Sequence, residues 1–235
     1  MTSALLISVL TKNQQQFHPV IAFDPAKDKL LPLDITSQNT ELTHDILSET
    51  KRFTKWVDEK LIADKARYGI GGYNEHRTVY SISQVFDAEN ASEEPRRLHL
   101  GTDIWGKPHT SVMAPLDGIV HSFAFNNQFG DYGATIIISH LLEGISFYTL
   151  YGHLSLNSIK NIQEGDRLEK RDVFAEFGIP AENGSWPPHL HFQIINDMGE
   201  WSGDYPGVCK FSEKEKWLMN SPDPDIILQL NKHIG

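Results

Sequence analysis

Hydrophobic and polar positions alternate in short runs through the middle of the chain. Between about residues 78 and 196, stretches rich in β-branched and aromatic residues are bounded by Gly, Pro, Asn and Asp, a pattern typical of strands. The runs that we expect to form strands are TVYSISQVF, SVMAPLDGIVHSFAF, ATIIISH, ISFYTLYGHL, VFAEFG and HLHFQII. Several short strands at close spacing predict a mainly β core, built as a sandwich or a partly closed barrel.

The N-terminal part of the chain has a different texture. The apolar run ALLISVL is expected to be a strand, and the glycine-rich YGIGGYN is expected to be a connector. Between them, apolar residues recur at helical spacing among charged ones, which predicts an amphipathic helix that packs against the β core or restricts its groove. These apolar residues are Phe53, Trp56, Val57 and Leu61.

The C-terminal part is expected to be helical. FSEKEKWL carries Ser212 and Glu215 at the spacing of a capping box, and SPDPDIILQL has turn residues followed by apolar ones. We therefore expect three parts, namely an N-terminal α+β extension over residues 1–77, a β domain over 78–196 and a helical tail over 197–235.

The net charge of the chain disfavours one class of binding partner. The 235 residues include 31 acidic and 21 basic side chains, which give a formal charge of −10 and disfavour nucleic acid as a partner. A hydrophobic content of 40% is ample for a buried core. A cationic substrate or a neutral peptide fits this charge better.

The expected location is the cytoplasm, since no basic residue precedes ALLISVL and no small-x-small cleavage signal follows it. The periplasm, or export by another route, stays open. The single cysteine, Cys209, cannot form an internal disulfide, so the fold does not depend on an oxidising compartment. No window approaches the roughly 20 apolar residues of a membrane span.

Three segments of the β region carry possible catalytic chemistry. They are HLGTD with His99 and Asp103, YGHL with His153, and HLH with His189 and His191. Alternate residues of a strand share a face, so the two imidazoles of HLH would lie about 6 to 7 Å apart and could reach one small object. Two histidines and one carboxylate are a sufficient ligand set for catalytic zinc. Each segment alone also fits a surface pair or a hydrogen-bonded core histidine.

Taken in order, HLGTD, APLDGIV, YGHL and HLHF resemble the lysostaphin-type (LytM-like) zinc endopeptidases, whose pattern is H-x-G-x-D, A-x-x-G-x-V, Y-G-H-L and H-L-H-F. The resemblance spans residues 78–196 and implies a lysostaphin-like β-sandwich or partly open barrel, the duplicated hybrid motif, with helical additions at both ends.

The resemblance also implies a zinc metallopeptidase that hydrolyses peptide bonds, in peptidoglycan-type peptides or their fragments, with a zinc-activated water. One Zn²⁺ per chain would be held by His99, Asp103 and His191. His153 and His189 would be the catalytic pair outside the ligand set. The sequence predicts no oligomeric state.

Three positions depart from the family pattern. His109 in KPHTSV, and Arg171 and Phe174 in RDVFAEFG, stand where glycines are common, which touches the loops and strands that shape the groove. Gly118 in PLDGIV is expected to adopt a turn conformation with positive φ.

Other residues of this half have simpler interpretations. We expect Tyr151 to be packed and His140 to be structural. Trp186 would either line a substrate groove or sit at the base of a loop.

Three other functions stay open. A lysostaphin-like domain can serve as an inactive binding or regulatory module. The flanks, partly through SPDPDIIL, resemble a peptidase-like module found between a kinase-like phosphotransferase and a class III aminotransferase, which implies a cytosolic role in small-molecule metabolism. APLDGIV and the paired histidines also resemble a sugar phosphotransferase phosphocarrier domain, in which a histidine accepts phosphate.

Overall fold

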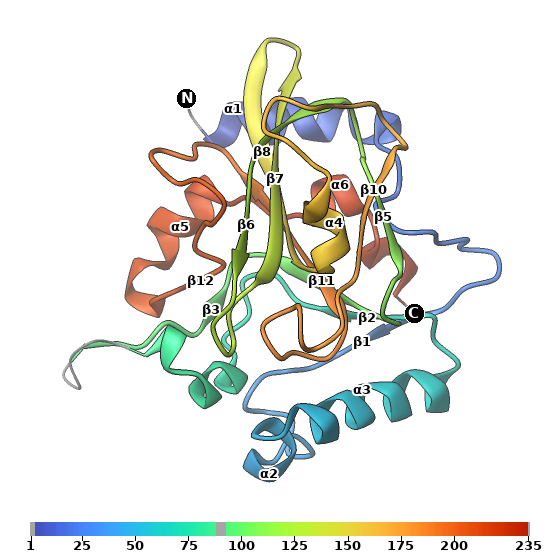
Figure 1. The fold of residues 1–235 in the computed structure, drawn as a ribbon, viewed down its shortest axis with the longest axis vertical. Coiled ribbons are helices and arrows are strands. Elements are labelled where there is room, and N and C mark those ends of the chain that lie inside the picture. Colours follow the sequence, from blue (N-terminus) through green and yellow to red (C-terminus); the bar gives the residue numbers. More distant parts are fainter. Residues whose placement is uncertain (1–2, 88–92, 235) are drawn as a thin grey trace.

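A computed structural model describes residues 3–87 and 93–234, and its centre is one mixed sheet (Figure 1). The strand order is β1-β2-β4-β11-β8-β7-β6-β9, in which β1 and β2 are parallel and the other pairs are antiparallel. Two strand pairs, β10 with β5 and β12 with β3, complete the β structure of these residues. The mainly β prediction is confirmed, and the large sheet does not close into a barrel, since β1 and β9 are its edges.

The strands are β1 (Leu30–Pro32), β2 (Tyr68–Gly71), β3 (Leu98–His99), β4 (Thr102–Trp105), β5 (Ser111–Met113), β6 (Gly118–Asn126), β7 (Gly133–Leu142), β8 (Ile145–Leu154), β9 (Arg167–Leu168), β10 (Val173–Glu176), β11 (His189–Ile195) and β12 (Val208–Cys209). The helices are α1 (Ser3–Lys12), α2 (His44–Leu47), α3 (Thr50–Asp64), α4 (Leu156–Lys160), α5 (Lys214–Asn220) and α6 (Asp225–Leu228). Short 3₁₀ turns cover Gln14–Gln16, Thr78–Ile82, Gln84–Phe86, Phe211–Glu213 and Asn231–His233.

The centre of the sheet is covered on both faces. In β7, Ile136 and Ile138 join the main core cluster, whereas Ile137 joins a second cluster with Leu150 and Ile195. Because side chains alternate along a strand, the three isoleucines of ATIIISH are buried on both faces of the sheet. The predicted strands ATIIISH, ISFYTLYGHL, VFAEFG and HLHFQII are present. The run SVMAPLDGIVHSFAF, predicted as one stretch, forms two separate strands, β5 and β6.

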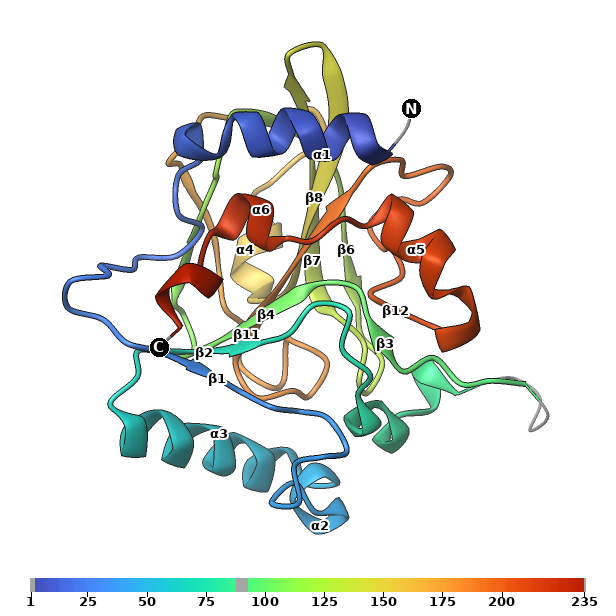
Figure 2. The same ribbon diagram turned by 180° about the vertical axis from the view of Figure 1, so that it is seen from behind.

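The chain ends pack onto this sheet. Figure 2 shows α1, α5 and α6 on one face and α3 below the β1 edge. Leu6 and Leu10 of α1 share the main core with Ile227 of α6. The predicted amphipathic helix is α3, and its Phe53 ring lies 5.7 Å from the ring of Trp105 in β4. Helix α3 therefore covers part of the β core, as expected.

Several local predictions were wrong. ALLISVL is not a strand but lies in α1, where Leu6, Val9 and Leu10 are buried at helical spacing. A short apolar run does not separate the two structures by period alone. TVYSISQVF forms two 3₁₀ turns instead of a strand, and part of YGIGGYN forms strand β2 instead of a connector.

Two predictions about single residues also failed. Helix α5 is present, but Glu213 is its N-cap residue without a side-chain cap, so Ser212 and Glu215 form no capping box. Gly118 does not have positive φ. Glycine is needed there because a Cβ atom would lie 2.4 Å from Ile138 Cγ2.

The division at residues 77 and 196 stays a prediction. The first part contributes β1 and β2 to the large sheet, and the last part contributes β12, which pairs with β3. None of the helices in the described parts of the chain is long and apolar enough to cross a membrane.

Candidate active site and metal centre

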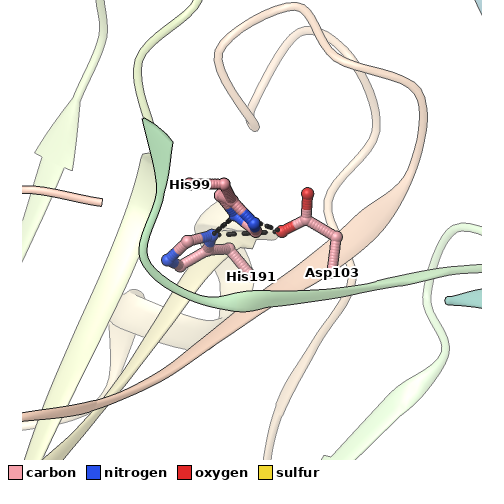
Figure 3. Close-up of side chains that lie close together, drawn as sticks. All are labelled: His99, Asp103 and His191. Carbon is pink, nitrogen blue, oxygen red and sulfur yellow. Dashed lines mark hydrogen bonds and ion pairs between the residues drawn. The ribbon is translucent and has the colours of Figure 1, made fainter. Parts of the chain in front are cut away.

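Three ligand-type side chains, from β3, β4 and β11, converge on one point (Figure 3). His99 ends β3, Asp103 lies in β4, and His191 lies in β11 directly opposite Asp103 in the antiparallel register. His99 Nε2 lies 2.9 Å from His191 Nδ1, and Asp103 Oδ1 lies 3.3 Å and 3.1 Å from these two nitrogens. The three side chains are almost fully enclosed, with 1%, 3% and 3% of each residue exposed.

The glycines beside these residues make room for them. A Cβ atom on Gly101, between His99 and Asp103, would lie 2.4 Å from Cε1 of His191. A Cβ atom on Gly152, before His153, would lie 2.5 Å from the ring of Tyr132. The spacing of HLGTD and YGHL therefore reflects close approach between strands as well as the chemistry of the polar residues.

The hydrogen bonds around the cluster fix where the imidazole protons lie. His99 Nδ1 faces the carbonyl oxygen of Gly72 at 2.9 Å, and His191 Nε2 faces Oε1 of Gln193 at 3.0 Å. Each nitrogen must donate to its oxygen, so in the neutral rings His99 Nε2 and His191 Nδ1 carry lone pairs. Two nitrogen lone pairs and a carboxylate oxygen thus face one another, which is an arrangement suited to a cation. The cluster could hold a metal ion.

Residues outside the cluster fix the orientation of His191 and Asp103 through hydrogen bonds. The side-chain amide of Gln193 donates to the carbonyl of Pro206 and the hydroxyl of Ser221, which turns its oxygen toward His191. Arg77 donates to Asp103 Oδ2 at 2.5 Å and leaves Oδ1 facing the histidines. Such outer contacts orient ligands and set their tautomers in metal sites.

Burial and the neighbouring Arg77 together set the charges of the cluster. Burial, followed by the charge of Arg77, lowers the pKa of His99 to about 4, so this ring is neutral at pH 7. Burial alone would raise the pKa of the Asp103 carboxyl, but the positive charge of Arg77 helps to hold it well below its usual value. At pH 7 the site therefore presents a neutral His99 beside an ionised Asp103.

His153 and His189 form a second pair next to the cluster. Their ring centroids are 4.1 Å apart, and the His153 ring is 6.3 Å from that of His191. His153 Nδ1 donates to the carbonyl of Asn183, and His189 Nδ1 donates to that of Pro187. Neither Nε2 atom has a hydrogen-bond partner within residues 3–87 and 93–234. Both neutral rings therefore offer a free lone pair.

The environment of this pair favours the neutral form. Burial lowers the pKa of His189 to about 4 and, together with the neighbouring His189, lowers that of His153 well below its usual value. His153 also has a backbone φ of +62°, a left-handed conformation that is uncommon outside glycine and concentrates at functional sites. This conformation sets the direction of the ring at the end of β8.

A pocket connects the two groups. Its lining includes Asp103 and His191 of the cluster and both residues of the pair, His153 and His189. Its cavity volume is about 120 Å³, which is room for a small chemical group beside these side chains. The arrangement can place one substrate group between a bound cation and two bases.

Comparison with known proteins assigns this region to a family. Residues 97–202 match the sequence profile of peptidase family M23. This part of the chain is an M23 peptidase domain. The M23 domain contains His99, Asp103, His153, His189 and His191.

Two curated proteins are similar in sequence. An "L-Ala--D-Glu endopeptidase" of Bacillus subtilis (strain 168) is 32% identical over 148 residues, which cover 59% of this chain and 43% of the relative. An "Uncharacterized metalloprotease" of Haemophilus influenzae is 33% identical over 98 residues, or 42% of this chain and 18% of the relative. The matches span less than half the length of either relative.

Solved structures are more distant. The catalytic domain of lysostaphin from Staphylococcus simulans is 20% identical, with a TM-score of 0.39, over 70% of this chain and 96% of that one. A putative M23 peptidase from Pseudomonas aeruginosa is 15% identical, with a TM-score of 0.37, over 77% and 62% of the two chains.

The structure also shows the surroundings of three other residues that were considered in the sequence. Tyr151 is packed between Phe174 and Phe192, as predicted. His140 is structural, since its two nitrogens face the carbonyl of Asp117 and the hydroxyl of Thr149. Trp186 lines the pocket.

The departures from the family pattern lie away from the cluster. His109 and Arg171 have φ values of +60° and +84°, which explains why glycine is common at these positions. His109 is exposed and faces Glu176 at 3.1 Å. Phe174 packs against Tyr151.

Three contributors were missed in the sequence. Gln193 continues the alternation of His189 and His191 along β11, so the period of two could have placed it on the same face. Tyr132 lies 3.3 Å from His191 Nε2 through its hydroxyl, and Arg77 lies outside the M23 domain. Nothing in their local sequence marks these last two residues.

Proposed function

We propose that the chain is a zinc-dependent metalloendopeptidase in which His99, Asp103 and His191 hold one Zn²⁺ per chain. The observation that carries this proposal is the convergence of His99 Nε2, His191 Nδ1 and Asp103 Oδ1, with the imidazole protons directed to Gly72 and Gln193. Two nitrogen donors and one carboxylate are a known ligand set for catalytic zinc, whereas magnesium and calcium prefer all-oxygen sites.

Zinc bound there would polarise the substrate carbonyl and lower the pKa of a water molecule toward 7. The other chemistry falls to the chain's own histidines. His153 and His189 each present a neutral Nε2 toward the pocket, fixed by the bond from Nδ1 to a backbone carbonyl. One Nε2 can accept the proton of the attacking water.

The protonated ring then becomes a donor. Its new Nε2–H can stabilise the tetrahedral oxyanion or return the proton to the leaving amine. Because His153 and His189 are only 4.1 Å apart, one charged ring opposes protonation of the other. We therefore propose that the pair carries one proton at a time.

The proposed substrates are short peptides of the peptidoglycan type. The name of the Bacillus subtilis relative, which describes cleavage between L-Ala and D-Glu, supports this class. The histidine pair lies deep in the pocket, since His153 and His189 are 6% and 2% exposed, and Tyr80 and Trp201 belong to the pocket walls. Soluble fragments fit such a pocket better than cross-linked polymer does.

An inactive binding module is disfavoured, because both the cluster and the histidine pair are complete. Catalysis in small-molecule metabolism and the cytoplasmic location stay predictions.

Metal analysis tests the proposal. Purified wild type should carry about one zinc per chain after dialysis, and Asp103→Ala and His191→Ala should carry little. His153→Ala and His189→Ala should retain zinc but lose hydrolysis of a synthetic peptide that contains the L-Ala-D-Glu bond.

His121→Ala is the matched control, since this histidine lies in β6 and outside the pocket lining. It should keep both zinc and activity. A wild-type protein without zinc would contradict the metal assignment. Equal zinc loss in His189→Ala and His191→Ala would contradict the division of roles.

A further inference from the structure

A buried arginine outside the M23 domain supports the metal cluster. Arg77 is only 1% exposed and follows β2 in the chain, whereas the family match begins at residue 97. Its Nη1 donates to Asp103 Oδ2 at 2.5 Å and to the hydroxyl of Tyr80 at 3.2 Å. Its Nε donates to Glu75 Oε2 at 2.6 Å.

The same segment also supports His99. The carbonyl of Gly72 accepts from His99 Nδ1 at 2.9 Å and from Arg77 Nη2 at 3.3 Å. One short segment of the chain, residues 72–77, therefore contacts two of the three side chains that we propose as zinc ligands, His99 through the Gly72 carbonyl and Asp103 through the Arg77 side chain. A Cβ atom on Gly71 would lie 2.7 Å from Arg77 Nη2, so this stretch passes close to the guanidinium.

We propose that Arg77 is a positioning residue for the zinc site, which holds Asp103 so that only Oδ1 is offered to the metal. This inference rests on the proposed metallopeptidase function. A planar guanidinium that is bonded on several sides can fix a carboxylate in a way that a flexible ammonium cannot. The N-terminal region is then part of the catalytic apparatus.

Arg77 would act on the metal site by orienting Asp103 more than by its electrostatic field. The positive charge of Arg77 would oppose a nearby cation, but Glu75 lies against its Nε and balances that charge. Removing Arg77 leaves the Glu75 carboxylate without its partner and frees Oδ2 of Asp103 to move. The added negative charge by itself favours a cation, so weaker metal binding would report the lost orientation of Asp103. Loss of an outer partner of a metal ligand lowers metal affinity or activity by about 10- to 100-fold.

The test compares Arg77→Met and Arg77→Lys in the full chain. Zinc affinity is measured by competition with a chelator, and the ligand environment is read from the d–d absorption of protein loaded with Co²⁺ in place of zinc. Arg77→Met should bind zinc about 10- to 100-fold more weakly, and its cobalt bands should shift because Asp103 is no longer fixed. Arg77→Lys should recover part of the affinity, since an ammonium can still reach Oδ2.

Arg67→Met is the matched control, because Arg67 also pairs with an aspartate, Asp28, at 2.8 Å but on the surface. It should leave both readouts unchanged. If Arg77→Met does not fold, Arg77→Lys keeps the buried charge and must still show weaker zinc binding.

Wild-type affinity and an unchanged cobalt spectrum in the Arg77 variants would overturn the positioning role, while the proposed function would stand. A wild-type protein that binds neither metal would overturn the proposed function itself. The two failures are therefore distinguishable.

Discussion

Adding one methyl group beside the cluster should disable it. In Gly101→Ala the new Cβ atom would lie 2.4 Å and 2.5 Å from Cε1 and Nε2 of His191, and 2.8 Å from the carbonyl oxygen of Phe192. Restoring the shortest contact to an ordinary 3.4 Å requires a displacement of about 1 Å. Metal–ligand distances tolerate only about 0.2 Å.

The ring of His191 cannot move alone, because its Nε2 is held by Gln193 at 3.0 Å and lies 3.3 Å from the hydroxyl of Tyr132. We therefore expect Gly101→Ala to lower stability by about 1–3 kcal/mol, as overpacking does, and to weaken zinc binding at least 10-fold. Zinc affinity is measured by chelator competition, and stability by urea denaturation without metal.

Gly118→Ala is the matched control. Its Cβ atom would also lie 2.4 Å from a neighbour, Ile138 Cγ2, but in the core away from the cluster. It should lose a similar amount of stability and keep zinc affinity. Equal zinc affinity in Gly101→Ala and wild type would refute the reasoning, since the crowding would then be relieved without moving His191.

Four further predictions follow from the structure. Burial lowers the pKa of His140 from 6.5 to about 4, so this residue should reduce the free energy of unfolding by about 1.3 kcal/mol as the pH falls from about 7.5 to 5.5. In urea denaturation, His140→Gln should therefore lose about 1.3 kcal/mol less than wild type over this range, and an equal loss would contradict the assignment. Arg171→Gly should raise the unfolding free energy by about 0.5–1 kcal/mol, because Arg171 has positive φ; an unchanged midpoint would contradict this. Deleting residues 1–75 should prevent folding, as judged by circular dichroism, because β1 and β2 leave the sheet and Trp105 is uncovered. Chromatographic product analysis should show hydrolysis of soluble peptide fragments but little release from intact peptidoglycan, because the substrate must reach the buried histidine pair. Equal rates on the two substrates would contradict this expectation.

The strands of the β region were predictable because their signals are local. Runs such as ATIIISH and HLHFQII are bounded by turn residues and rich in β-branched or aromatic side chains, so period and composition agree. ALLISVL lacks such agreement: it is apolar throughout, yet Leu5 and Ile7 are exposed at 46% and 37% while Leu6 and Leu10 are buried. Only packing against the sheet and α6 reveals its helical period.

The polar residues of the site were predictable for a similar reason. HLGTD and HLHF place His99, Asp103, His189 and His191 within two short motifs, and the register of β11 against β4 sets His191 opposite Asp103. The alternation of side chains along a strand also predicts that Gln193, two residues after His191, lies on the same face. Its role became visible only with Pro206 and Ser221, which come from later in the chain and fix the direction of its amide.

The position of Arg77 could not be predicted from its local sequence. Its neighbours in sequence contain no motif, and an arginine beside Glu75 is ordinarily a surface residue. Its burial follows from β2 pairing with β4, which sets Gly71 opposite Asp103 and carries the following loop over the cluster. A buried guanidinium is tolerated only when it is paired, and here the pairing partner, Asp103, is itself a proposed ligand. The same pairing therefore ties the N-terminal strands to the chemistry of the M23 domain, a connection that neither segment expresses in its own sequence.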